Sequence, residues 1–176
     1  MSERDGQPSD TRLDPERLPE LIDRLHRAAW AMCGSPHDAE DLVQETFAGT
    51  LKRPRALRRP NPLPYLMRAL RNTYMTSLRT ASRRPRTIEL PADESSAMES
   101  SLGRPHLALE QRATFEAIAA LPEQFRAALV AVDIVGLSYG EAARALNTGE
   151  TTIASRLHRA RRHVACALRD GRSPAG

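Results

Sequence analysis

Apolar residues recur every three or four positions along most of the chain, which is the period of a helix that buries one face. A polar tail, residues 1–13, precedes the first such face and is expected to be disordered. The face ends at Gly34, because glycine commonly terminates helices. Trp30 lies off this face, so its ring is expected to pack against a neighbouring helix. The apolar positions of this predicted core helix are Leu18, Leu21, Ile22, Leu25, Ala29 and Met32.

A second helix is predicted to begin at Ser35 and Pro36. Serine caps a helix N-terminus, and proline at the first helical position loses no hydrogen bond. The helix is expected to bury one side, made of Ala39, Leu42 and Val43, with Phe47 at the flank.

Three carboxylates of this second helix, Asp38, Asp41 and Glu45, share one face because they stand at i, i+3 and i+7. Like charges at this spacing repel mildly, so the stripe does not stabilise the helix by itself. The spacing alone leaves open a solvated face, a protein interface and, third, a metal site. No histidine stands at the spacing of helical metal sites, and His37 points off the stripe, so no metal is expected.

A basic, proline-rich stretch, residues 52–64, precedes a long predicted helix. The side of this helix that faces away from its apolar stripe carries an aromatic ring, an amide and several guanidinium groups. Such a face suits single-stranded nucleic acid, although a solvated basic face remains the alternative. The apolar stripe is Leu63, Leu66, Met67, Leu70, Tyr74 and Leu78, and the other side carries Tyr65, Arg68, Asn72, Thr76 and Arg79, with Arg71 at the edge.

Residues 85–109 are rich in serine, proline and acidic residues and have no sustained apolar period, so they are predicted to form a linker. A helix is expected from Glu110, and Pro122 is expected to start another that ends at Gly136. Their predicted core positions are Phe115, Ile118, Ala119 and Leu121, then Phe125, Leu129, Val132 and Ile134 or Val135.

The stretch of residues 136–162 predicts a helix-turn-helix. Ser138 and Glu141 form a capping-box pattern, and Asn147 with Gly149 suits the turn because both residues tolerate a left-handed backbone. The first helix is expected to bury Ala142, Ala143 and Leu146, and the second Ile153, Leu157, Ala160 and Val164. The free side of the second helix carries hydroxyl and guanidinium groups, which bind base edges and phosphates. A helical hairpin with a solvated basic face is the alternative.

Composition and short motifs limit the kinds of protein that this chain can be. The 176 residues carry a net charge of +4, which suits a polyanionic partner, and 4% aromatic residues favour small cores. No stretch approaches the roughly 18 to 20 apolar residues of a membrane span, and residues 1–10 contain no apolar signal segment, so we expect a cytoplasmic protein without membrane insertion. Cys33 and Cys166 form no CxxC pair and are expected to be buried or half-buried thiols. The sequence contains no GxSxG, GxxxxGK[ST] or HExxH motif, so we do not expect an enzyme.

Four motifs in order carry a family resemblance: DAEDLVQETF (residues 38–47), PYLMRALRN (64–72), ALPEQFRAAL (120–129) and SRLHRARR (155–162). Together they resemble a group IV, or extracytoplasmic-function, bacterial RNA polymerase sigma factor. The resemblance implies an all-α fold with two small helical domains: sigma region 2 in residues 14–84 and sigma region 4 in residues 110–170. It implies no cofactor. The implied partners are core RNA polymerase, through the beta-prime clamp helices and the beta flap, promoter DNA, and an anti-sigma factor.

The resemblance also assigns residues to three surfaces. The first would dock on the clamp helices, the second would open and read the minus-ten element as melted DNA, and the third would read the minus-thirty-five element as duplex in the major groove. The core-binding residues are Asp38, Asp41, Gln44, Glu45 and Phe47. The minus-ten residues are Arg55, Arg58, Arg59, Asn61, Tyr65, Arg68, Arg71, Asn72 and Arg79. The minus-thirty-five residues are Thr151, Thr152, Ser155, Arg156, Arg159 and Arg162.

The sequence departs from the family pattern at three places. The family often has an acid where Thr76 stands, glycine and an aliphatic residue at 147–148, and a basic residue where Ala154 stands. The differences at Thr76 and Ala154 bear on which promoter sequence is recognised. The difference at residues 147–148 bears on the angle of the turn. Two other readings compete with a sigma factor: a sigma-like decoy that binds an anti-sigma factor without initiating, and a stand-alone helix-turn-helix repressor.

Overall fold

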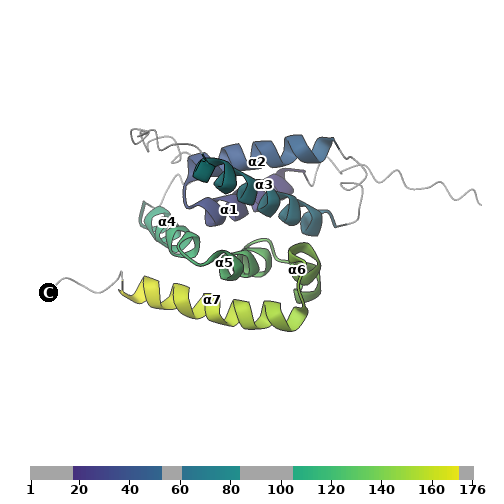
Figure 1. The fold of residues 1–176 in the computed structure, drawn as a ribbon. Coiled ribbons are helices and arrows are strands. Elements are labelled where there is room, and N and C mark those ends of the chain that lie inside the picture. Colours follow the sequence, from purple (N-terminus) through teal and green to yellow (C-terminus); the bar gives the residue numbers. More distant parts are fainter. Residues whose placement is uncertain (1–17, 53–60, 84–104, 171–176) are drawn as a thin grey trace, which may run out of the picture.

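The computed structural model describes residues 18–52, 61–83 and 105–170, and every element in these ranges is helical (Figure 1). The N-terminal half contains α1 (Leu18–Cys33), α2 (Pro36–Leu51) and α3 (Leu63–Arg83). The C-terminal half contains α4 (Pro105–Ala119), α5 (Glu123–Leu129), the π-helical turn η3 (Val130–Ile134), α6 (Tyr139–Leu146) and α7 (Glu150–Asp170). The predicted all-α fold is confirmed.

The core of the N-terminal half is built as the apolar periods predict. Leu25, Met32, Leu66 and Leu70 are fully buried between α1, α2 and α3. Small residues assist, because Ala28 and Ala31 are also buried and let the helices approach closely. Trp30 packs against a neighbouring helix as expected: its ring centroid lies 4.5 Å from that of Phe115 on α4.

Two apolar residues predicted to lie in this core are exposed. Ile22 is 42% exposed, because α1 centres its buried face on Leu21, Leu25 and Ala28, which leaves position 22 at the edge. Leu78 is 43% exposed, because residues 76–82 of α3 are all exposed, so the end of that helix projects beyond its neighbours. Both predictions were therefore wrong.

The first helix of the C-terminal half starts earlier than expected. Helix α4 begins at Pro105 rather than at Glu110, so it overlaps residues 105–109 of the predicted linker. The remaining linker residues that fall in 84–104 lie outside the described residues, as do the tail and residues 171–176. Gly136 ends the α5–η3 segment with φ of +81°, as predicted, although the apolar period did not predict the π-helical turn.

The helix-turn-helix is present, and its predicted capping box and left-handed Asn147 are confirmed, whereas the prediction for Gly149 is wrong. The Ser138 hydroxyl accepts from the Glu141 amide, while the Glu141 carboxylate accepts from the Ser138 amide at 2.9 Å. Asn147 adopts a left-handed backbone with φ of 51°, whereas Gly149 does not. Ile153, Leu157 and Ala160 anchor α7 to α5 and α6 with at most 1% exposure. The turn therefore depends on asparagine alone for its positive φ.

No helix in the described residues is both long and apolar enough to cross a membrane.

Candidate functional site

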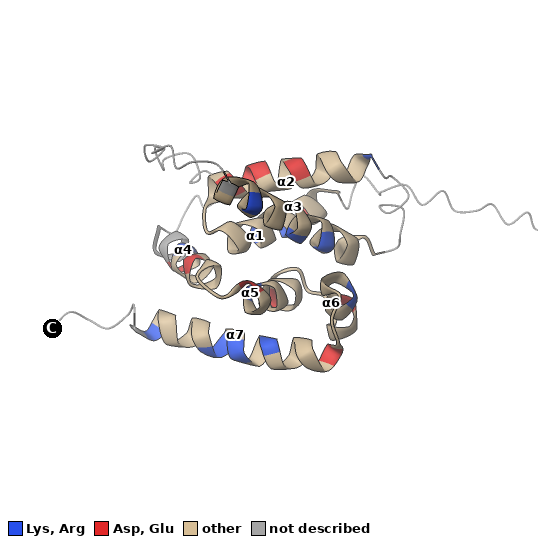
Figure 2. Cartoon of the chain, in the orientation of Figure 1, with Lys and Arg blue, Asp and Glu red and all other residues tan. Residues whose placement is uncertain are grey.

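The acidic stripe of α2 faces solvent. Ser35 begins the helix by accepting a hydrogen bond from the Asp38 amide at 3.3 Å, and Pro36 occupies the first turn as predicted. This start turns Ala39, Leu42 and Val43 inward, so Asp38, Asp41, Gln44 and Glu45 are all exposed, and Phe47 is half-buried beside them. No ion pair within the described residues neutralises these carboxylates. Figure 2 shows acidic residues on α2.

Among the described residues, no three His, Cys, Asp or Glu side chains are grouped in a way that could hold a metal ion. The acidic stripe of α2 is thus a charged surface spread along a helix and not a compact set of ligands.

The face of α3 that is predicted to bind single strands is partly open. Arg68, Asn72 and Arg79 are exposed, and Tyr65 is half-buried. Arg55, Arg58 and Arg59 lie outside the described residues. The open members place two guanidinium groups and an amide along one side of the helix, a combination that can bind phosphates and base edges.

Two further members of that surface are already engaged by the C-terminal half. Nε of Arg71 donates to Oε1 of Glu123 on α5 at 2.6 Å, and both side chains are less than one third exposed. Nδ2 of Asn61 donates to Oε1 of Glu141 on α6 at 2.8 Å, while its Oδ1 accepts from the Leu63 amide at 3.2 Å. These partners are 52 and 80 residues away in sequence, so no local sequence pattern predicts the two contacts.

The predicted duplex-reading face of α7 is open along its length. Thr151, Ser155, Arg159 and Arg162 are exposed, and Thr152 and Arg156 are half-buried. The Ser155 hydroxyl donates to the Thr152 carbonyl at 3.0 Å. In the described part of the chain, no ion pair or hydrogen bond holds the guanidinium groups of Arg156, Arg159 or Arg162. Figure 2 shows the basic residues spread along α7.

Sequence reasoning missed one buried charge. Arg126 on α5 is only 8% exposed, and its Nη1 donates to the carbonyl oxygens of Met32 at 2.8 Å and Ala119 at 2.7 Å. Its Nε is buried without a hydrogen-bond partner. Arg126 stands three positions before the buried Leu129, so helical spacing already placed it on the inward face.

The two cysteines differ from each other. Cys33 is half-buried, and its thiol donates to the Ala29 carbonyl at 2.9 Å. Burial, assisted by the charge of Asp38, raises the pKa of the Cys33 thiol. Cys166 is exposed, which contradicts the expectation that both thiols are buried or half-buried, because it lies on the side of α7 opposite the half-buried Val164 and Leu168.

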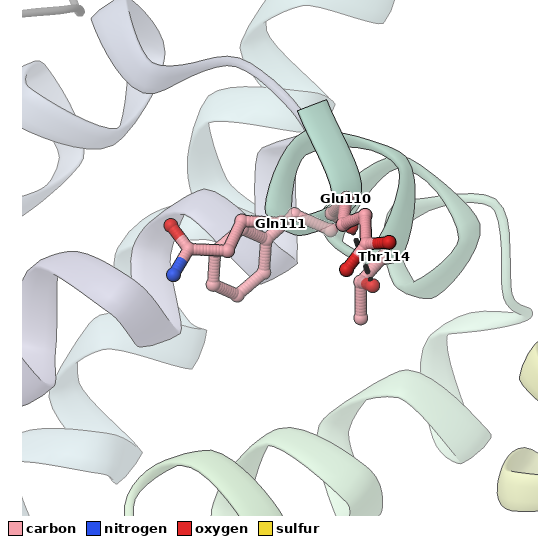
Figure 3. A pocket seen from close by; sticks show the side chains of 4 residues that line it. Glu110, Gln111 and Thr114 are labelled. Carbon is pink, nitrogen blue, oxygen red and sulfur yellow. Dashed lines mark hydrogen bonds between the residues drawn. The ribbon is translucent and has the colours of Figure 1, made fainter. Parts of the chain in front are cut away.

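Two hollows lie beside α4, and neither gathers the chemistry of a catalytic site. Figure 3 shows the smaller one, lined by Glu110, Gln111, Thr114 and Phe115, where the Thr114 hydroxyl donates to the Glu110 carbonyl at 2.8 Å. The larger one is an apolar groove between α4, α5–η3 and α7. Its mostly apolar lining includes Phe115, Ile118, Leu129, Ile134, Val164 and Leu168.

Comparison with known proteins gives the family of the chain. The Sigma-70 region 2 model matches residues 20–84, and the Sigma-70, region 4 model matches residues 111–164. The chain is 32% identical over 152 residues to the ECF RNA polymerase sigma factor SigE of Mycolicibacterium smegmatis, covering 85% of this chain but only 59% of that relative. It is 34% identical to the sigma factor EcfG of Rhodopseudomonas palustris, covering 84% of this chain and 80% of EcfG.

Solved structures share the fold. The sigma factor RpoE from Bartonella quintana, in complex with the anti-sigma factor NepR, superposes with a TM-score of 0.65 at 21% identity, over 88% of this chain and 95% of that one. CnrH, in complex with the cytosolic domain of CnrY, gives a TM-score of 0.59 at 23% identity, over 93% and 94% of the two chains. With α1–α3 matching region 2 and α4–α7 matching region 4, the chain belongs to the ECF family of RNA polymerase sigma factors.

Proposed function

We propose that the chain binds core RNA polymerase and directs it to promoters, with region 2 opening and reading the minus-ten element and region 4 reading the minus-thirty-five element. The observation that carries this proposal is the separation of charge on exposed faces. Within the described part of the chain, an acidic stripe without ion pairs lies on α2, and a basic face whose Arg156, Arg159 and Arg162 have no ion pair lies on α7 of a helix-turn-helix. Region 2 and region 4 family matches coincide with these two faces.

The acidic stripe supports polymerase docking. Carboxylates that repel one another and lack a partner gain most from a cationic protein surface. We assign core binding to Asp38, Asp41, Gln44 and Glu45, with half-buried Phe47 supplying an apolar contact beside them. The beta-prime clamp helices are the proposed partner.

The basic faces support separate contacts to melted and duplex DNA. On α3, Tyr65, Arg68, Asn72 and Arg79 offer a ring, an amide and charges to an unpaired strand, and capture of flipped-out bases would lower the net cost of opening. On α7, Ser155, Arg156 and Arg159 would enter the major groove from the N-terminal part of the recognition helix. The exposed guanidinium groups of Arg68, Arg79 and Arg159 favour an initiating factor over a decoy, because a decoy has no use for them.

Partners and location follow from the same proposal. Promoter DNA lies with RNA polymerase in the cytoplasm, so we place the chain there. Among the solved structures that share its fold, the sigma factor RpoE is in complex with the anti-sigma factor NepR, and CnrH is in complex with the cytosolic domain of CnrY. We extend this to an anti-sigma partner for the present chain.

The test of core binding is Asp41→Lys, which reverses one charge in the centre of the α2 stripe. We expect co-purification with core polymerase to be lost, because a cation would face a cationic surface, while circular dichroism stays unchanged. Asp23→Lys is the matched control: Asp23 is an exposed carboxylate of α1 that pairs with Arg27 of its own helix at 2.9 Å. Equal recovery of polymerase with both variants would contradict the assignment.

The test of the whole function is reconstitution with core polymerase on a randomised promoter library. We expect transcripts that depend on the chain and share two conserved elements, one for each DNA-binding region. Transcripts that share only the upstream element would point to a stand-alone duplex binder.

A further inference from the structure

The recognition helix α7 is held on both flanks by one segment, α5–η3, which lies beside it (Figure 1). On one flank, Arg161 donates two hydrogen bonds to Asp133 of the π-helical turn, from Nε to Oδ2 at 2.9 Å and from Nη2 to Oδ1 at 2.6 Å. On the other flank, the ring of His163 stacks on that of Phe125 with centroids 6.2 Å apart. We name these two contacts together the α7 brace.

The two contacts of the brace stand on opposite sides of the buried stripe of α7. Successive residues of an α-helix turn by about 100°, so Arg161 and His163 point about 160° apart around the helix axis. On the buried side between them, Ala160 is fully buried and Val164 is half-buried. These small side chains present little apolar area, so apolar contacts alone restrain the rotation of the helix only weakly here. The brace supplies the restraint that the stripe lacks.

The π-helical turn carries the carboxylate of the brace. In η3 the Val135 amide donates to the Val130 carbonyl, five residues earlier, at 2.9 Å. This wider turn changes the direction in which side chains leave the helix, and such turns frequently accompany functional sites. Asp133 is the one charged residue in the VAVDI sequence of η3, and its side chain is 30% exposed. A departure from α-helical geometry thus coincides with the residue that holds α7.

Arg161 differs from the other arginines of α7 in its direction and in its partner. Arg161 and Arg159 point about 160° apart, so Arg161 lies away from the face that would enter the major groove. In the described part of the chain, a carboxylate holds Arg161, whereas Arg159 and Arg162 have no ion pair. An exposed ion pair adds little to stability as a rule, but a bidentate pair of arginine and carboxylate also fixes direction. The pair with Asp133 is therefore suited to orienting α7.

We propose that Asp133 and Phe125 are positioning residues for duplex reading. Through their partners on α7 they fix the rotation of that helix, and with it the side chains that face the major groove. The idea rests on the proposed function, which assigns the exposed face of α7 to the minus-thirty-five element. Bidentate contacts to base edges require a defined geometry, so a roll of α7 would weaken the preference for the correct sequence.

The readout is the preference of the reconstituted holoenzyme between two templates that compete in one transcription reaction. One template carries the upstream element that the unmodified chain selects from the randomised promoter library. The other carries the same element in scrambled order, and the two promoters are otherwise identical. A variant that folds less well, or binds polymerase less well, lowers both transcripts by the same factor. The ratio of the two transcripts therefore reports on reading of the upstream element and not on folding.

Asp133→Asn keeps the shape of the side chain and removes its charge. We expect the transcript ratio to fall about tenfold, as for the loss of one bidentate base contact. Asp23→Asn is the matched control: it makes the same change in a pair with Arg27 on α1, at 2.9 Å, and should leave the ratio unchanged. Phe125→Leu keeps an apolar side chain and removes the ring that stacks on His163, so it should lower the ratio about threefold.

A charge swap separates positioning from direct DNA contact. Asp133→Arg alone should lower the ratio at least as much as Asp133→Asn, because two guanidinium groups would then repel each other. Adding Arg161→Asp restores an ion pair with its partners exchanged, and the ratio should rise again. If Arg161 touched DNA itself, a carboxylate at position 161 would repel the phosphates and no rise would follow.

The outcomes distinguish the positioning role from the proposed function. An unchanged ratio for Asp133→Asn or Phe125→Leu, or a charge swap that does not raise the ratio, would overturn the positioning role while the unmodified chain still prefers its selected template. If the unmodified chain itself directs no transcription or selects no upstream element, the proposed function fails and the positioning role fails with it.

Discussion

The basic faces of α3 and α7 are similar in sequence and different in availability. Both helices have 21 residues and carry arginines on the side opposite an apolar stripe. On α7, no described side chain pairs with Arg156, Arg159 or Arg162, whereas on α3 the edge residue Arg71 is bound by Glu123 from another region. The comparison teaches that a basic helix face becomes a DNA-binding surface only if the tertiary structure leaves it free.

The largest expected effect is on stability and comes from truncating a buried side chain that anchors α7. Leu157 is 1% exposed beneath the recognition helix, so Leu157→Ala should lower the free energy of unfolding by about 2 to 5 kcal/mol through lost burial and a residual cavity. Leu78→Ala on α3 is the control. Leu78 is 43% exposed, so its loss should change stability by about 0.5 kcal/mol or less. Urea denaturation measures both, and similar midpoints would show that α7 is not anchored through Leu157.

An intermediate effect tests whether the α7 face is as open as the structure indicates. Arg159→Ala should weaken binding to a duplex minus-thirty-five element by about 1 to 3 kcal/mol, because a guanidinium contact to a base edge or phosphate is lost. Arg169→Ala, an exposed residue in the last turn of the same helix, should leave this affinity unchanged. Fluorescence anisotropy with promoter and unrelated duplexes measures the loss. An equal loss on both duplexes would indicate a phosphate contact and not sequence reading.

The smallest effect concerns the cap that starts α6 and positions Glu141 for Asn61. Ser138→Ala should cost about 1 kcal/mol of stability at neutral pH, because both hydrogen bonds of the Ser138 hydroxyl are lost. Ser77→Ala, which removes a hydroxyl within α3, should change stability by less than about 0.5 kcal/mol.

The stability loss of Ser138→Ala should also depend on pH. Hydrogen bonds from the backbone and then the side chain of Ser138 hold the pKa of the Glu141 carboxyl below its ordinary value. The stabilisation is therefore complete above the ordinary pKa of a glutamate and is lost as the pH falls through the lowered value. The difference between the unmodified chain and Ser138→Ala should shrink on acidification. A difference that grows in acid would contradict this role of Glu141.

Local physics made much of the fold readable from the sequence. The cap at Ser35, the capping box at Ser138 and the left-handed turn at Asn147 each depend on residues within four positions of one another. Apolar periods found the helices and most of their buried faces for the same reason. They failed for Ile22 and Leu78, because the exact width of a buried face depends on where the neighbouring helices end.

The sequence by itself determined the all-helical fold, the helix-turn-helix and the acidic and basic stripes, since residues a few positions apart set helical periods and caps. Only the tertiary structure decided which charged residues stay free. The bond between Arg126 and Met32 joins residues 94 positions apart, and the pair of Arg71 and Glu123 joins residues 52 apart. Such contacts form only after two separate helical units have packed, so no pattern within one helix encodes them.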